Sequence, residues 1–370
     1  DILTSIKNYI VQNYDASCFN PTVEKFLTEC QQNRNVISTL GDTKQTIDSL
    51  KSNRQILIQY INQLNLLKSK MSFGKDKFAI HLEWMWKDTL KNSNWSSLNI
   101  NFEIYNVLYD LAITYYNIGR VEAAEAGDDD TKLKEAIKAY QYAAGFFDKI
   151  KNEAPLSIQD KELPNDLKPN YMTYCSCICI AKAQLLLIKV AEKKKTSASL
   201  LAQLCKGVED MYKNAQLIAK EKPLCKVLGD QYLYVINNRV NYSKAFTYSK
   251  LRDAALADFE KKGDGYGACL TYQGAIVQCL LDNEKEIKKI KVPMAKDALI
   301  YEKEKELGGQ MYEKNERVYK NSCPELQNLP KCPQKIMANS AMPPEFKDDI
   351  ENSRELDALI PREVKNMISQ

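Results

Sequence analysis

Along most of the chain, apolar residues recur every three or four positions, the spacing that places them on one face of an α-helix. Helix-breaking residues are scarce, with 13 Gly and 12 Pro among 370 residues. We therefore predict an almost wholly α-helical protein. The predicted helices cover residues 2–14, 21–39, 45–67, 103–126, 131–152, 169–194, 197–220, 223–261, 266–290 and 294–319.

One segment follows a different period. Between residues 78 and 86, apolar side chains occupy every second position, which is typical of a β-strand. Polar residues 92–94 favour a loop, and residues 98–102 are the expected antiparallel partner. The pattern predicts a small antiparallel sheet within residues 76–102.

The chain is too long for one compact core, so we expect either two domains or one elongated, curved helical array. The small residues Ala143, Ala144 and Gly145 suit close helix crossings like those of tetratricopeptide stacks, which favours the array. A Pro-rich C-terminal segment is expected to run extended over the surface of the array. The expected parts of a single domain over 1–370 are N-terminal helices (1–70), the small sheet (76–102), a helical core (103–319) and the extended segment (320–370).

Charge is balanced, with 52 basic and 48 acidic residues mixed along the chain. Nucleic-acid-binding proteins concentrate Lys and Arg on one surface, so no nucleic-acid partner is expected. The basic run Lys193–Lys195 is interpreted first as a solvated helix end and second as a membrane-surface contact. The apolar stretch 175–191 is interrupted by Lys182, Gln184 and Lys189, so we do not expect it to span a bilayer.

Residues for catalysis or cofactor binding do not form a recognisable pattern. His81, the one histidine, lies within the alternating segment without a visible orienting partner, so we interpret it as an exposed strand residue. No glycine-rich phosphate loop occurs. The acidic run Asp128–Asp130 suits the N-terminus of the helix that begins at Thr131 better than a calcium loop. We expect no enzyme activity, no small-molecule substrate and no cofactor.

The cysteines do not predict a metal site either. Cys175, Cys177 and Cys179 are spaced so that, on a helix, successive thiolates point about 200° apart and cannot converge on one ion. We interpret them as small buried apolar residues. Eleven cysteines without regular spacing instead indicate free thiols in a reducing, cytosolic compartment.

Several short motifs occur in the order and spacing of a known family. They are Trp86-Lys87-Asp88, Phe102-Glu103 with residues 107–112 (VLYDLA), residues 136–151 (AIKAYQYAAGFFDKIK), residues 181–184 (AKAQ), residues 200–204 (LLAQL), and Tyr319 with residues 323–326 (CPEL). Over nearly the whole chain, they resemble the Bro-one domain, the N-terminal domain of Alix-like proteins. The sequence departs from the family at Asp110 (usually Asn), Leu185 (usually Glu), Lys189 (one position early) and Val190 (Lys in Alix).

The resemblance implies a banana-shaped domain with a tetratricopeptide-like core. It also implies a cytoplasmic adaptor that is recruited to endosomes, associates peripherally with the endosomal membrane, and binds the Snf-seven-type subunit of ESCRT-III during multivesicular body formation. In the family, the C-terminal amphipathic helix of that subunit docks on the concave face. Carried over by position, Leu187, Leu200 and Leu204 are the implied apolar contacts. Asp130 and Lys134 are the implied polar pair.

The residues themselves allow two interpretations of this stripe. Leu200 and Leu204 are one helical turn apart, while Leu201, Val208 and Met211 form a neighbouring stripe that can face the core. A groove that binds a helix uses apolar anchors at this spacing, with charges at its rim. Most apolar residues on helices nevertheless belong to the core. The family resemblance favours docking.

Two further alternatives stay open. Tyr319 matches a family tyrosine that is linked to a second surface and to phosphotyrosine signalling, and packing beneath the Pro-rich segment is its other interpretation. For the whole domain, the alternative to an endosomal adaptor is a divergent signalling or adhesion scaffold, of the kind known in amoebic parasites.

We expect all 11 cysteines to be reduced thiols. Titration with a thiol reagent should find few reactive groups in the native protein and all of them after denaturation, because free cysteines are usually buried. A stable native disulfide would contradict the cytosolic assignment.

Overall fold

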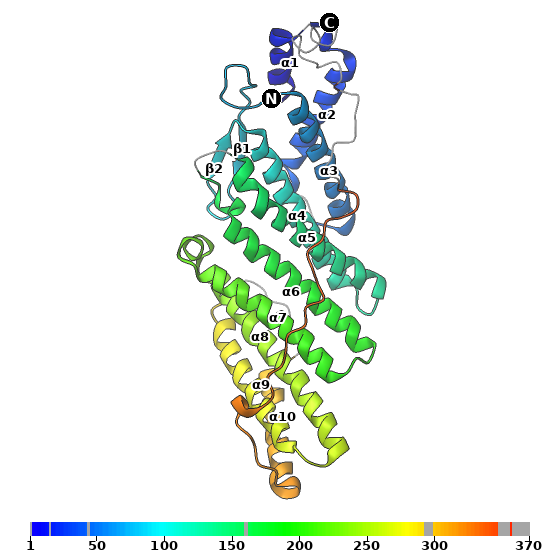
Figure 1. Cartoon of the computed structure of the whole chain (residues 1–370), viewed down its shortest axis with the longest axis vertical. Coiled ribbons are helices and arrows are strands. Elements are labelled where there is room, and N and C mark those ends of the chain that lie inside the picture. Colours follow the sequence, from blue (N-terminus) through cyan, green and yellow to red (C-terminus); the bar gives the residue numbers. More distant parts are fainter. Residues whose placement is uncertain are drawn as a thin grey trace. The chain divides into compact units, whose positions relative to one another are not determined.

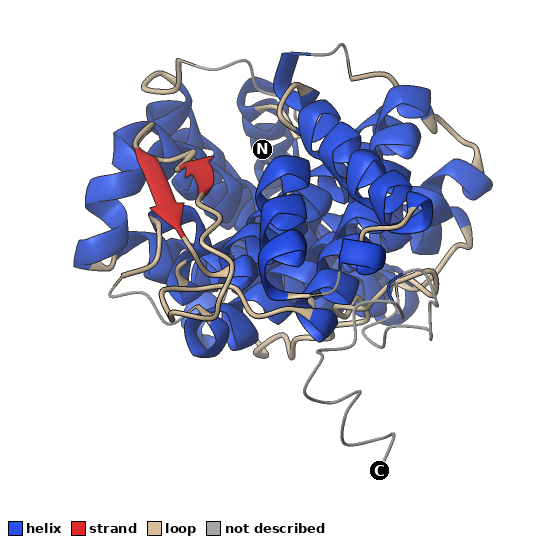
Figure 2. Cartoon of the chain, turned by 90° about the horizontal axis from the view of Figure 1, so that it is seen from above, coloured by secondary structure: helices blue, strands red, loops and turns tan. Residues whose placement is uncertain are grey.

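The computed structural model of this protein describes residues 2–14, 16–42, 45–158, 162–291, 299–346 and 356. Within these residues it contains ten α-helices and one two-stranded sheet (Figure 2). The chain forms two compact units, each assembled from separate stretches of sequence (Figure 1). Unit 1 comprises Asp1–Glu125, Tyr142–Met172 and Ala341–Gln370, and unit 2 comprises Ala126–Gln141 and Thr173–Ser340.

The predicted mainly α fold with a small antiparallel sheet is confirmed. The helices are α1 (Ile2–Asn13), α2 (Pro21–Ile37), α3 (Ile47–Lys70), α4 (Ile100–Glu125), α5 (Asp130–Ser157), α6 (Pro169–Lys193), α7 (Ala198–Lys220), α8 (Lys222–Lys262), α9 (Tyr266–Ile287) and α10 (Tyr301–Lys314). Some predicted limits differ from the structure. Helix α5 continues past Pro155 to Ser157, and because this proline lies in the last turn, only one backbone hydrogen bond is lost and little helix follows it. Helix α8 is interrupted at Gly229, whose φ is 73°. Residues 292–298, where the last predicted helix begins, lie outside the described residues.

The sheet is smaller than predicted and has a different second strand. Strand β1 (Trp84–Lys87) pairs antiparallel with β2 (Asn94–Ser97). The predicted partner, residues 98–102, instead leads into α4. The side-chain oxygen of Asn99 accepts the backbone N–H of Asn101, and this local bond favours a helix start over a strand.

His81 consequently lies before the strand and not within it. The residue is exposed, as predicted, and its Nε2 atom lies 3.0 Å from the carbonyl oxygen of Asp76. The alternating pattern around His81 comes from a loop that turns its apolar side chains inward, with Ile80 and Leu82 buried. Alternation by itself therefore overestimated the strand by several residues.

One buried carboxylate connects the sheet of unit 1 to three helices. Glu103 of α4 is 0% exposed. Its Oε1 atom lies 2.7 Å from Nε of Arg34 on α2 and accepts the hydroxyl of Tyr60 on α3 at 2.9 Å. The indole N–H of Trp86 on β1 donates to Oε2. Burial raises the pKa of Glu103, and the attraction of Arg34 opposes that rise.

Two further buried carboxyl groups secure the end of the hairpin. Asp88 is 1% exposed, and its Oδ2 atom accepts the backbone and side-chain N–H groups of Asn165. Asp166 is 2% exposed, and its Oδ2 accepts the backbone N–H and the hydroxyl of Thr89. Its Oδ1 has no hydrogen-bond partner among the described residues. Burial raises the pKa of Asp166 from 3.8 to about 6, and the neighbouring Asp88 adds to that rise.

Unit 2 is built around α8, which packs against both α7 and α9. Ala245 of α8 and the α9 residues Ile276 and Leu280 form one buried apolar cluster. Tyr266 of α9 and Met311 of α10 belong to a second cluster. These contacts hold the long helices in the order of the sequence, as expected for stacked helical hairpins.

The raised pKa of Asp166 predicts how stability depends on pH. The folded chain holds the proton more strongly than the unfolded chain, so ionisation of Asp166 should lower the free energy of unfolding as pH rises from about 4 to about 6. The effect should be on the order of 2 kcal/mol. Asp166→Asn keeps an acceptor for Thr89 and should remove this dependence. Urea unfolding of both proteins between pH 4 and pH 7 measures the difference, and a difference that is flat with pH would contradict the assignment.

Candidate functional site

A single buried amide organises the face where α6 meets α7. Gln184 of α6 is 0% exposed. Its Nε2 donates to the carbonyl oxygen of Leu204 on α7 at 3.3 Å and to that of Lys335 at 2.8 Å. Its Oε1 accepts the backbone N–H groups of Met337 and Ala338, each at 3.0 Å. All four hydrogen-bonding positions of the amide are therefore used.

The C-terminal segment crosses α7 at this point in an extended conformation. The N–H of Lys335 donates to the carbonyl oxygen of Gln203 at 2.9 Å. A Cβ atom at Gly207 would lie 2.6 Å from the carbonyl oxygen of Lys335, so this close crossing requires glycine. The extended course expected for the Pro-rich segment is thus observed here, held by backbone contacts that periodicity does not reveal.

The three leucines implied by the family resemblance do not share one environment. Leu187 of α6 and Leu200 of α7 are partly exposed. Leu204 is 2% exposed, so it is a core residue and not the exposed anchor that was expected. The reason is tertiary, because α6 and the C-terminal segment both bond to the α7 backbone at Gln203 and Leu204.

The neighbouring stripe on α7 behaves as predicted. Leu201 and Met211 are each 6% exposed, and Val208 is 1% exposed. Gln184 connects α7 to the C-terminal segment, because its Nε2 donates to carbonyl oxygens of both. Leu187 and Leu200, near the ends of α6 and α7 that residues 194–197 join, are partly exposed.

The implied polar pair also differs from the expectation. Asp130 pairs with Lys193 at the end of α6, at 3.1 Å, and not with Lys134. Lys134 is exposed and has no ion pair within the described part of the chain. Asp129 caps α5, since its Oδ1 accepts the N–H groups of Thr131 and Lys132. The acidic run Asp128–Asp130 therefore does stabilise the start of α5, and Asp130 also forms an ion pair with Lys193.

The lysines that end α6 tie that helix to the loop before α5. Lys189 donates to the carbonyl oxygen of Gly127 at 2.6 Å, and Lys193 donates to that of Asp128 at 2.7 Å. Lys193 thus lies at the end of α6, as predicted, but its ammonium group bonds to Asp128 and Asp130 and is not simply solvated. These contacts give this end of α6 a defined geometry.

Among the described residues, α6 is the one helix long and apolar enough to cross a membrane by length and composition. Its most apolar window has a mean hydropathy of 1.6, and 44% of it is buried inside the protein. Its polar residues have protein partners: Lys182 lies 5.6 Å from the ring centre of Tyr140, and Gln184 and Lys189 are hydrogen-bonded. A core helix accounts for this composition.

The three closely spaced cysteines of α6 differ in burial. Cys179 is 1% exposed, whereas Cys175 and Cys177 are partly exposed. None of the 11 cysteines, all within the described residues, forms a disulfide. Within the described residues, no cluster of three His, Cys, Asp or Glu side chains could hold a metal ion.

Tyr319 lies in an aromatic group at the end of α10. Its ring centre is 4.6 Å from that of Tyr266 and 4.8 Å from that of Phe259. The ammonium group of Lys314 lies 5.3 Å from its ring centre. The side chain is partly exposed, so its packing is against helices α8 and α9 and does not hide it completely.

Sequence reasoning missed the structural role of Gln184, although the signal was present. A glutamine within an otherwise apolar helical stretch predicts a buried amide with several partners. The partners themselves were not predictable, because Lys335 and Ala338 are about 150 residues away along the chain.

The chain matches the BRO1-like domain family over residues 1–370. Human programmed cell death 6-interacting protein is 25% identical over 173 residues, which are 46% of this chain and 20% of that protein. Vacuolar protein-sorting protein BRO1 of Yarrowia lipolytica is 27% identical over 216 residues, which are 55% of this chain and 24% of that protein. The matched region is thus a fifth to a quarter of each relative.

Solved structures share the fold. The complex of the ALIX BRO1 domain with CHMP4C has a TM-score of 0.77 and 18% identity, covering 94% of this chain and 95% of that chain. ALIX in complex with the SIVmac239 PYKEVTEDL late domain has a TM-score of 0.80 and 16% identity, covering 100% of this chain and 51% of that chain. Because the family match extends over residues 1–370, this chain belongs to the BRO1-like domain family.

Proposed function

We propose that this chain is a cytoplasmic adaptor that is recruited to endosomes and docks the C-terminal amphipathic helix of an ESCRT-III subunit on the face formed by α6 and α7. The family is one of protein-binding scaffolds, and one structural neighbour is a complex with CHMP4C. A related protein of Yarrowia lipolytica carries the name vacuolar protein-sorting protein. These findings support the endosomal setting of the proposal.

The observation that carries the proposal is the partial exposure of Leu187 and Leu200. They lie on consecutive helices, near the short connection over residues 194–197. Two aliphatic side chains on adjacent helices suit the apolar stripe of an amphipathic partner. Leu204, whose side chain is almost wholly buried, belongs to the core beneath this surface.

The rim supplies polar contacts of both signs. Lys134 on the first turns of α5 is exposed and can meet an acidic residue of the partner. The side chain of Asp130 is 57% exposed although it pairs with Lys193, so its carboxylate can also contact a partner. Exposed pairs of this kind contribute about 0–1 kcal/mol, so they orient the partner more than they stabilise the complex.

The docking stripe can be tested with a double substitution. Leu187→Asp combined with Leu200→Asp should weaken binding of a synthetic CHMP4C C-terminal helix by about 30-fold, because buried apolar anchors dominate such interfaces. Isothermal titration calorimetry measures the dissociation constant. Leu217→Asp is the matched control, since Leu217 is 64% exposed elsewhere on α7 and its change should leave binding intact. Equal effects of both variants would sink the proposal, as would an absence of binding to the unmodified chain.

Leu204 should respond differently from Leu200. Leu204→Asp places a charge in the core and should lower the free energy of unfolding by about 3 kcal/mol or more. Leu200→Asp changes a partly exposed position and should cost about 1 kcal/mol or less. Thermal melting followed by circular dichroism compares the two. Similar melting temperatures would show that the two leucines have the same environment, against the structure.

A further inference from the structure

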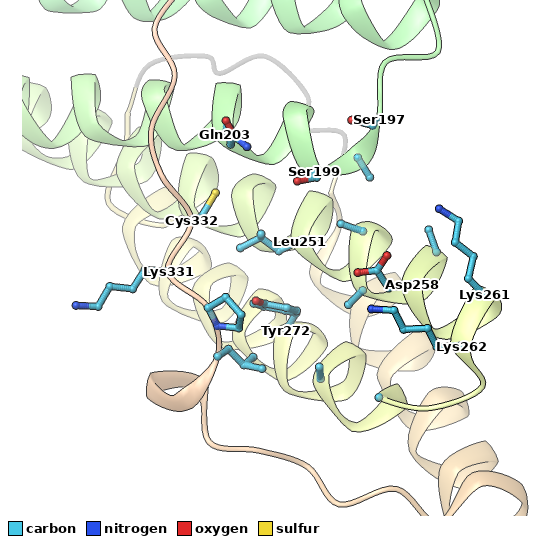
Figure 3. Close-up of a pocket in the computed structure, with 18 of the residues that line it drawn as sticks. Ser197, Ser199, Gln203, Leu251, Asp258, Lys261, Lys262, Tyr272, Lys331 and Cys332 are labelled. Atoms are coloured by element: carbon cyan, nitrogen blue, oxygen red, sulfur yellow. The ribbon is translucent and has the colours of Figure 1, made fainter.

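An open groove of about 540 Å³ lies in unit 2, apart from the stripe described above (Figure 3). It is bounded by the first turns of α7, the last turns of α8, the start of α9 and the extended residues 329–333. Its base is lined by small side chains, which leave room for a bulky side chain of a ligand. These residues are Ala254, Ala255, Ala257 and Ala268, together with Leu251.

A largely buried tyrosine presents its hydroxyl to this groove. Tyr272 lines the groove and is 6% exposed. Its hydroxyl makes no hydrogen bond with any residue that the structure describes. Burial raises the pKa of Tyr272, so the hydroxyl stays protonated and can donate. Because the hydroxyl is open to the groove, an acceptor on a ligand can bond to it.

The extended wall of the groove also has free hydrogen-bonding groups. Lys331 and Cys332 line the groove, and their backbone groups make no hydrogen bond within the described residues. The next backbone bond of this segment is made by Lys335 to Gln203. An extended backbone with unpaired N–H and C=O groups can accept a second extended peptide alongside it.

The charges at the mouth favour an anionic ligand. Lys261 and Lys262 at the end of α8 are exposed and have no ion pair in the described part of the chain. Ala198 and Ser199 form the first turn of α7, where backbone N–H groups and the helix dipole attract negative charge. Two aspartates, Asp258 and Asp264, also line the groove, so with Lys331 its lining has three lysines against two aspartates and a net positive charge.

From these features we infer that the groove is a second protein-binding site, which takes a short, extended, acidic peptide segment with a bulky apolar side chain. The apolar side chain occupies the alanine-lined base, and an acceptor of the peptide bonds to Tyr272. The peptide backbone runs beside Lys331 and Cys332, with its acidic residues toward Lys261 and Lys262. This site is independent of the leucine stripe on α6 and α7.

The probe for this site is a fluorescein-labelled heptapeptide, Glu-Glu-Asp-Phe-Val-Asp-Glu, titrated with the full chain and followed by fluorescence anisotropy. Ala254→Leu fills the base and should weaken binding about 10-fold. The double variant Lys261→Glu with Lys262→Glu should also weaken it about 10-fold at low salt. Tyr272→Phe removes one hydroxyl and should weaken binding about threefold.

Matched controls separate this site from general effects of charge and from the leucine stripe. The double variant Lys222→Glu with Lys226→Glu makes the same charge change at exposed positions elsewhere on α8 and should leave binding unchanged. The single variant Leu187→Asp, on α6, should also bind the probe normally. Absence of saturable binding, an undiminished affinity of the Ala254→Leu variant, or equal losses in the two lysine double variants would overturn the inference. Circular dichroism confirms that each variant is folded.

Discussion

The side-chain amide of Gln184 is the interaction on which the arrangement of α6, α7 and the C-terminal segment depends. It makes four hydrogen bonds from a fully buried position and joins α6, α7 and the C-terminal segment at one point. Losing the amide itself would remove a partner from four backbone groups, and each group left buried and unsatisfied costs about 1–3 kcal/mol. Such a junction has one satisfied arrangement, so it determines where the segment lies on α7 as well as stabilising it.

Because the segment is held there, it shapes two different surfaces of unit 2. Upstream of Lys335, residues 329–333 form one wall of the groove beside α8 and α9. At Gln203 and Gly207 the segment crosses the turn of α7 that carries Leu204, which is buried, whereas Leu187 and Leu200 stay partly exposed. A Pro-rich stretch without secondary structure thus acts as a structural element, because backbone hydrogen bonds and a glycine contact hold it.

Unit 1 depends on buried charge in a comparable way. Glu103 gathers Arg34, Tyr60 and Trp86 from three elements, so the hairpin and two helices are oriented around one carboxylate. Burial also raises the pKa of Asp110, which stands in place of the Asn implied by the family resemblance, to about 7. A carboxyl at that position brings an ionisable group where the amide would be neutral at every pH. The hairpin region of this chain therefore has a pH response that an amide at this position would lack.

The sequence by itself determined the helical class, most helix limits and the presence of a small sheet, because these follow from the local spacing of apolar residues. It also carried the motifs that identify the family, and the expectation of free cysteines. The environment of individual site residues was decided only by the tertiary structure. Leu200 and Leu204 are equivalent in a helical pattern, yet one is partly exposed and the other is core, because a segment more than 100 residues away crosses beside Leu204. The partner of Asp130 is likewise Lys193 on another helix and not the lysine one turn away. Periodicity specifies which face of a helix is apolar, whereas long-range contacts decide how much of that face stays open to a partner.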